Sequence, residues 1–290
     1  IGGGAAAALL AAGLWLLLSP AAPPAPSAPA ELAAPPPPPR AGLPATPLLE
    51  EEAILALQPA QPGMVRVKSN PRVFVLLFTE LEQQGAALNR VAALVEKRGL
   101  PRDRLLGDAE LAAAIAASGD TPATWFYGHD YRLGDLNRFF ALAERDQVPL
   151  NEAELWVRDR LREAVAQAVP GEPLALVSIA NAGPRMDAAM RAAILRHELA
   201  HGHYFTWPGF AEHVHMVWRE RFSEADRQAL TRFLGREGYD AGNADLMANE
   251  AMAYLLFTPD ARIFDAAALG VTEAQLERLR GLMRNGLPLP

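Results

Sequence analysis

The chain has 290 residues, a formal net charge of −7 and no cysteine. The lack of cysteine excludes disulfide bonds, thiolate nucleophiles and thiolate metal sites, and the negative charge argues against a nucleic-acid partner, which requires a surplus of basic residues. The length suffices for one large hydrophobic core or two modest ones.

Residues 1–30 begin with an uncharged apolar stretch that predicts export. Its apolar part, residues 5–18, has the length of the hydrophobic region of a signal peptide, and Ala28-Pro29-Ala30 offers a small-x-small cleavage site. Without cleavage, the apolar run over residues 1–18 is just long enough for a membrane anchor. We therefore expect a periplasmic or extracellular protein, which is either released or tethered to the membrane by residues 5–18.

Residues 31–63 are dominated by alanine, proline and leucine and predict a disordered linker. The run Pro35–Pro39 favours an extended, semi-rigid chain that cannot build a core. We expect the folded part to begin near Met64, with an N-terminal subdomain over 64–170 and a catalytic subdomain over 171–290.

The folded part starts with Arg72–Phe78, whose β-branched and aromatic residues predict a buried strand. Thr79 is a suitable N-cap for a helix that extends to about Arg98. Further helical patterns cover 108–117, 134–146 and 151–168, and Leu174–Ala180 predicts a second strand.

Between these elements, Trp125–Tyr131 is an aromatic-rich segment that we interpret as a loop. Its His129 and Asp130 have side chains capable of contacting a substrate. Its aromatic residues also suit a loop that anchors the N-terminal subdomain.

The most informative motif is H-E-x-x-H at His197 to His201, within a helical pattern that starts near Met186. Two histidines four residues apart lie on the same face of a helix and can bind one zinc ion, while Glu198 lies beside the open coordination position. Zinc lowers the pKa of a bound water, and a neighbouring carboxylate can accept the water's proton.

A third ligand is needed, and Glu250 is the leading candidate. It belongs to the helical pattern Asp245–Phe257 and shares its face with apolar residues. A carboxylate that faces a core is costly unless a cation neutralises it. Rival ligands occur on the helical pattern that follows His201, namely Glu212, His213, His215 and Glu220, whereas we expect His203 to be a rim residue.

The two segments H-E-L-A-H and N-E-A-M-A-Y resemble the gluzincin branch of zinc metallopeptidases, over residues 186–257 only. The resemblance implies that His197, His201 and Glu250 bind Zn²⁺ and that Glu198 is the general base. A variant with a third histidine in the extended motif does not apply, because Trp207 occupies the position of that histidine.

Two departures from the family pattern are visible. The segment between His201 and Glu250 is longer than in the thermolysin-like members, and Tyr254 replaces the aspartate that orients a zinc-bound histidine there. Tyr254 can orient that histidine through its phenol, donate a hydrogen bond to the oxyanion formed during hydrolysis, or simply pack in the core.

The resemblance also implies an edge strand before the motif helix, against which an extended peptide substrate lies. We expect strand 174–180 to be that edge, with Ser178–Asn181 supplying the backbone hydrogen bonds to the substrate. A closing helix from Thr272 to about Arg284 completes the pattern.

The sequence thus predicts a mostly helical α+β, zincin-like fold with a small sheet. The expected function is zinc-dependent hydrolysis of peptide bonds in a peptide or protein substrate. The alternative is a non-catalytic zincin-like protein of the cell envelope that binds a metal or a partner. Another amide, such as a cell-wall linkage, would suit the same metal and base.

Overall fold

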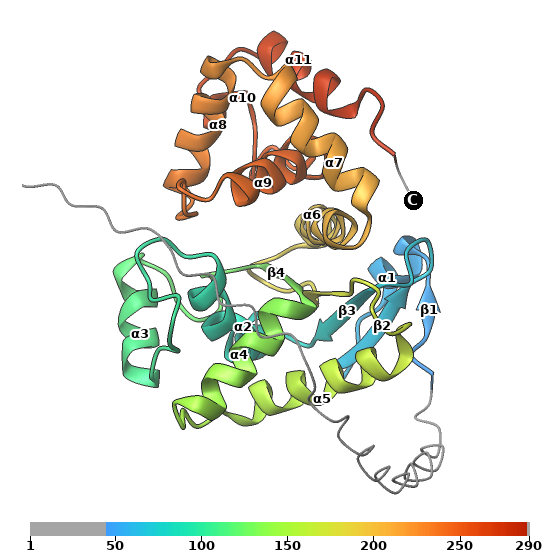
Figure 1. Cartoon of the computed structure of the whole chain (residues 1–290), viewed down its shortest axis with the longest axis vertical. Coiled ribbons are helices and arrows are strands. Elements are labelled where there is room, and N and C mark those ends of the chain that lie inside the picture. The colour runs from blue at the N-terminus through green and yellow to red at the C-terminus, as the bar shows by residue number, and fades with distance from the viewer. Residues whose placement is uncertain (1–44, 289–290) are drawn as a thin grey trace, which may run out of the picture. The chain divides into compact units, whose positions relative to one another are not determined.

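The computed structural model describes residues 45–288, which contain five strands and a larger number of helices (Figure 1). The strands are β1 (Leu48–Leu49), β2 (Gly63–Val67), β3 (Val73–Phe78), β4 (Gly128–Arg132) and β5 (Ala175–Ala180). The helices are α1 (Glu51–Ala56), α2 (Leu81–Val95), α3 (Asp108–Ala117), α4 (Leu133–Arg145), α5 (Glu152–Gln167), α6 (Ala188–Thr206), α7 (Pro208–Met216), α8 (Glu224–Arg236), α9 (Ala244–Phe257), α10 (Ala266–Leu269) and α11 (Glu273–Arg284), with a π-helical turn η1 (Val217–Arg221) after α7. The predicted mostly helical α+β class is confirmed.

The strands form one mixed sheet in the order β1-β2-β3-β5-β4. The central strands β3 and β5 are parallel, and all their residues are buried, as expected for strands covered by helices on both faces. The prediction that 174–180 forms the edge is wrong. The backbone of β5 is already paired with β3 and β4, so Ser178–Asn181 are not free to pair with a substrate.

The edge position beside β5 belongs to β4, which is antiparallel to it and comes from the segment expected to be a loop. Its side chains alternate between the two faces of the sheet. Gly128 and Asp130 face α6, whereas His129 points to the other face and lies 3.0 Å from the Ser178 hydroxyl through its Nδ1 atom. This alternation sorts the polar residues of β4, so that Asp130 reaches the motif helix and His129 does not.

The folded part begins earlier than expected, because β1 and α1 lie within the predicted linker 31–63. Ile54 of α1 is fully buried, and Arg191 donates a hydrogen bond of 2.8 Å to the carbonyl of Leu55. The predicted signal peptide or anchor at 1–30 lies outside the described residues. Among those that are described, no helix is long and apolar enough to cross a membrane.

Helix α6 carries the H-E-x-x-H motif and lies between the sheet and the C-terminal helices (Figure 1), with a hydrophobic core on each side. One core joins the sheet to α1, α2, α4 and α5, and the other joins α7 to α11. The Asp187 side chain caps α6 by accepting a hydrogen bond of 2.8 Å from the Met190 amide. Gly202 lets α6 approach the sheet, because a Cβ atom there would lie 2.7 Å from Val73. The motif is therefore held rigidly above the sheet.

Candidate metal centre

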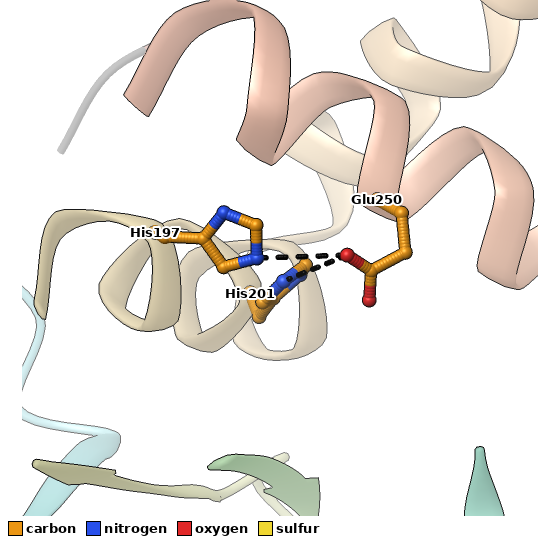
Figure 2. Close-up of side chains that lie close together, drawn as sticks. All are labelled: His197, His201 and Glu250. Carbon is orange, nitrogen blue, oxygen red and sulfur yellow. Dashed lines mark ion pairs between the residues drawn. The ribbon is translucent and has the colours of Figure 1, made fainter. Parts of the chain in front are cut away.

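Three side chains predicted as ligands come together between α6 and α9. His197 and His201 lie one helical turn apart on α6, and Figure 2 shows Glu250 reaching toward both imidazoles from α9. The Glu250 Oε2 atom is 3.5 Å from Nε2 of His197 and 3.6 Å from Nε2 of His201. Helical spacing accounts for the pairing of the histidines, whereas packing of α9 on α6 brings in the carboxylate.

The separations and the burial of these atoms fit a divalent cation. Ligand atoms at about 2.0–2.2 Å from a tetrahedral ion lie about 3.3–3.6 Å apart, which matches the observed spacing. Nε2 of His201 and Oε2 of Glu250 are buried and have no hydrogen-bond partner. Buried polar atoms without partners are destabilising, and a cation bound between them would satisfy both.

The cluster provides three protein ligands, and no fourth histidine or carboxylate of the described residues joins it. The rival ligands lie elsewhere. His213 donates from Nε2 to the carbonyl of Met283 at 2.9 Å, and His215 lies 3.1 Å from Asp245. Glu212 and Glu220 are exposed. A cation bound here would keep an open coordination position, which is typical of catalytic sites rather than structural ones.

Thr258, which sequence reasoning missed, orients His197. The Thr258 hydroxyl donates to the carbonyl of Ala253 at 3.0 Å, so it accepts from Nδ1–H of His197 at 2.8 Å. Burial also lowers the pKa of His197 to about 3, which keeps the ring neutral. The lone pair of Nε2 therefore points toward Glu250, as a metal ligand requires. Tyr254 does not orient this ring through its hydroxyl; it packs edge-on against it, with ring centroids 4.8 Å apart.

Replacing Thr258 by valine is expected to weaken metal binding by about 10- to 100-fold, because valine keeps the shape but cannot accept the Nδ1 proton. Competition with a chromophoric chelator measures the affinity. The matched control is Thr231→Val on α8, outside the site, which should bind metal as the unaltered chain does. Equal affinity in both variants would show that Thr258 does not position the ligand.

Glu198 lies on the side of α6 that faces β4. Gly128 makes room for it, since a Cβ atom there would lie 2.3 Å from Oε1 of Glu198. Burial raises the pKa of both Glu198 and Asp130. The hydrogen bond that they share raises the pKa of Asp130 and lowers that of Glu198, which makes Asp130 the donor and Glu198 the acceptor. The other oxygen of Glu198, Oε2, has no partner. Glu198 is thus held in place with one oxygen available.

Two cavities flank the cluster. The first, which we call the aromatic cavity, has a volume of about 370 Å³ and contains His197, Glu198 and Tyr254 in a wall that includes Trp125, Phe126 and Tyr127. The second, which we call the polar cavity, has a volume of about 380 Å³, and its wall includes Asp130, Glu250 and Glu96. The ligand cluster therefore borders both cavities: His197 lines the aromatic cavity, together with Glu198, and Glu250 lines the polar cavity.

Glu96 is a second residue that sequence reasoning missed. Its side chain is buried, its Oε1 atom has no partner, and burial together with the charge of Glu250 raises its pKa to about 8. The only local signal was an acidic residue near the end of a helix, which normally faces solvent.

The prediction that His203 is a rim residue is wrong. His203 is buried, and its Nδ1 atom accepts a hydrogen bond of 3.1 Å from Asn70.

The chain was compared with protein-family models, curated proteins and solved structures, and none of them matches it. The similarity to gluzincins therefore stays a resemblance of two short segments.

Proposed function

We propose that this protein is a zinc-dependent hydrolase that cleaves peptide bonds with an activated water molecule. The observation that carries the proposal is the convergence of His197, His201 and Glu250, with unpartnered buried atoms on His201 and Glu250, beside Glu198 and the aromatic cavity. Zinc, when bound, lowers the pKa of a coordinated water and polarises the carbonyl of the substrate.

Three side chains, those of Glu198, Asp130 and Tyr254, are proposed to carry out the other steps of hydrolysis. Glu198 accepts a proton from the attacking water, whose oxygen forms a bond to the carbonyl carbon. When the carbon–nitrogen bond breaks, Glu198 returns the proton to the leaving amine. Asp130 keeps the Glu198 carboxylate in place through the hydrogen bond that it donates. Tyr254 lines the same cavity and is proposed to donate a hydrogen bond to the oxyanion.

The free edge of β4 suits an extended peptide. β4 pairs with β5 on one side, and no other strand of the described residues pairs with it on the other. Gly128 of β4 lines the aromatic cavity and Asp130 lines the polar cavity, so the strand runs past the ligand cluster. A substrate added to this edge would lay its backbone beside Glu198.

The test is metal analysis combined with a hydrolysis assay on the full chain. We expect about one zinc ion per chain and cleavage of short N-acylated peptides, which a chelator abolishes and added zinc restores. Cleavage that persists after complete metal removal would overturn the proposal, as would a zinc-loaded chain that cleaves none of a broad peptide mixture.

A further inference from the structure

Lys97 places an ammonium group in the wall of the aromatic cavity, together with His197 and Glu198. Its Nζ atom lies 4.3 Å from the ring centroid of Phe126 and 5.3 Å from that of Trp125. Lys97 is one of only two lysines in the chain, in which arginine is the main basic residue. A compact cation therefore lies in the same cavity as the proposed general base.

This ammonium has no ion-pair partner in the described part of the chain. The charge of Glu96 influences Lys97 most, followed by those of Asp120 and Glu237, which line the same cavity, but none of the three comes close enough to form an ion pair. The other lysine, Lys68, is by contrast exposed and lies 2.7 Å from Glu50. Burial lowers the pKa of Lys97, which reflects the loss of hydration that a charged partner would offset.

The backbone of Lys97 is fixed, and the Phe126 and Trp125 rings lie against its ammonium at the cavity. Its carbonyl accepts a hydrogen bond of 2.8 Å from Arg102, and its backbone forms an antiparallel bridge with Tyr239. Gly238 has a φ of 93° and leaves room for the side chain, because a Cβ atom there would lie 3.3 Å from Nζ. A preorganised charge loses little entropy when it binds a ligand.

The other cation in this cavity is already neutralised. Arg262 donates to Asp187 at 2.6 Å and to Asp260 at 2.9 Å, so its charge is balanced by two carboxylates. Among the described residues that line the aromatic cavity, Lys97 is the cation that remains available for a ligand.

We propose that Lys97 binds a carboxylate of the substrate, close to the bond that is cleaved. The carboxylate is either the C-terminal group of a peptide or an acidic side chain. The apolar wall of the same cavity, which includes Met190, Ile194 and Ile263, would hold an adjoining apolar group. This inference rests on the proposed function in one respect, namely that the aromatic cavity receives the substrate.

Binding is measured by calorimetry on the full chain carrying Glu198→Gln and loaded with zinc, so that no turnover occurs. One pair of probes is acetyl-Ala-Phe as the free acid and as its amide; the other is acetyl-Ala-Glu-amide and acetyl-Ala-Gln-amide. We expect the acid of at least one pair to bind about tenfold more tightly than its neutral partner. A preference in the first pair assigns the C-terminal carboxylate, and one in the second assigns an acidic side chain.

Adding Lys97→Met should remove this preference, whereas Lys68→Met, the same change at the exposed lysine, should keep it. The melting temperature of the Lys97→Met chain should stay equal or rise, because an unpaired buried charge is lost. The inference is overturned if neither acid is preferred, if no probe binds, or if the preference survives Lys97→Met. A preference that depends on Lys97 in a chain without hydrolytic activity would keep the carboxylate site and remove the proposed hydrolase function.

Discussion

Replacing Glu198 by glutamine is expected to reduce peptide hydrolysis by about three orders of magnitude while leaving about one metal ion bound per chain. Glutamine has the size of glutamate and can still accept the hydrogen bond from Asp130, but it cannot accept a proton from water. The proposed ligands His197, His201 and Glu250 are unchanged. The ratio kcat/KM on a cleaved peptide and the zinc content of the same sample are the two measurements.

The matched control for this change is Glu212→Gln, an exposed glutamate on α7 that is not part of the cluster. Its activity and zinc content should equal those of the unaltered chain. Two results contradict the assignment of Glu198 as the base: retained hydrolysis in Glu198→Gln, or a loss of activity that is fully explained by loss of zinc.

The helical half of the fold could be predicted because its signals are local. The apolar spacing around His197 and His201 fixes both histidines to one helix face. The apolar face of the second helix made Glu250 conspicuous, since a carboxylate rarely faces a core without a partner. The structure places both faces toward each other. Local periodicity was sufficient because each of these side chains is positioned by its own helix.

The edge strand β4 could not be predicted in the same way. Its sequence, Gly128 to Arg132, alternates between two environments, but neither of them is simply apolar. On one face Gly128 and Asp130 accommodate the motif helix, and on the other His129 bonds to a serine of β5. Because residues of β4 serve the site, its sequence lacks the usual alternation of apolar and polar residues, and from sequence alone the strand resembles a loop.

The residues that support the ligands also escaped prediction, because they act across long sequence separations. Thr258 follows the end of α9 yet bonds to His197 on α6. Glu96 lies near the end of α2 yet is buried beside the polar cavity. A threonine after a helix and an acidic residue near a helix end are common surface features. Only tertiary packing, of α9 on α6 and of α2 on the sheet, gives these two residues their buried surroundings.

Replacing Glu250 by leucine should affect stability in opposite directions with and without metal. In the metal-free chain, the change removes a buried carboxyl oxygen without a partner and should stabilise the fold by about 1–3 kcal/mol. With zinc at about a thousand times its dissociation constant, the unaltered chain should gain about 4 kcal/mol, and Glu250→Leu should gain almost nothing. Urea denaturation of each chain, with a chelator and with zinc, gives the four free energies of unfolding.

The free energies of unfolding in this experiment depend on pH, because buried ionisable groups titrate at different pH values in the folded and unfolded chain. Burial raises the pKa of Glu250 above its unfolded value of 4.5, so its proton is retained in the folded state and its effect on stability becomes more unfavourable as pH rises above about 4.5. Burial lowers the pKa of His201 to about 4, so the metal-free chain loses stability as pH falls below about 6.5. At pH 7.5 the histidine effect is absent in both states, so the difference between the two chains reports Glu250 together with Glu96, whose pKa the Glu250 charge helps to raise.

A surface change, Glu212→Leu, serves as the control and should shift the free energy of unfolding by less than about 0.5 kcal/mol under either condition. If metal-free Glu250→Leu is less stable than the metal-free unaltered chain, the hydrogen bond that Tyr239 donates to Glu250 outweighs the cost of the unpartnered Oε2 atom, and the metal-free carboxylate is not unfavourable. If zinc stabilises both chains equally, the ion binds elsewhere. Opposite shifts, in contrast, require that Glu250 be unfavourable alone and favourable with metal, which is the property expected of a ligand.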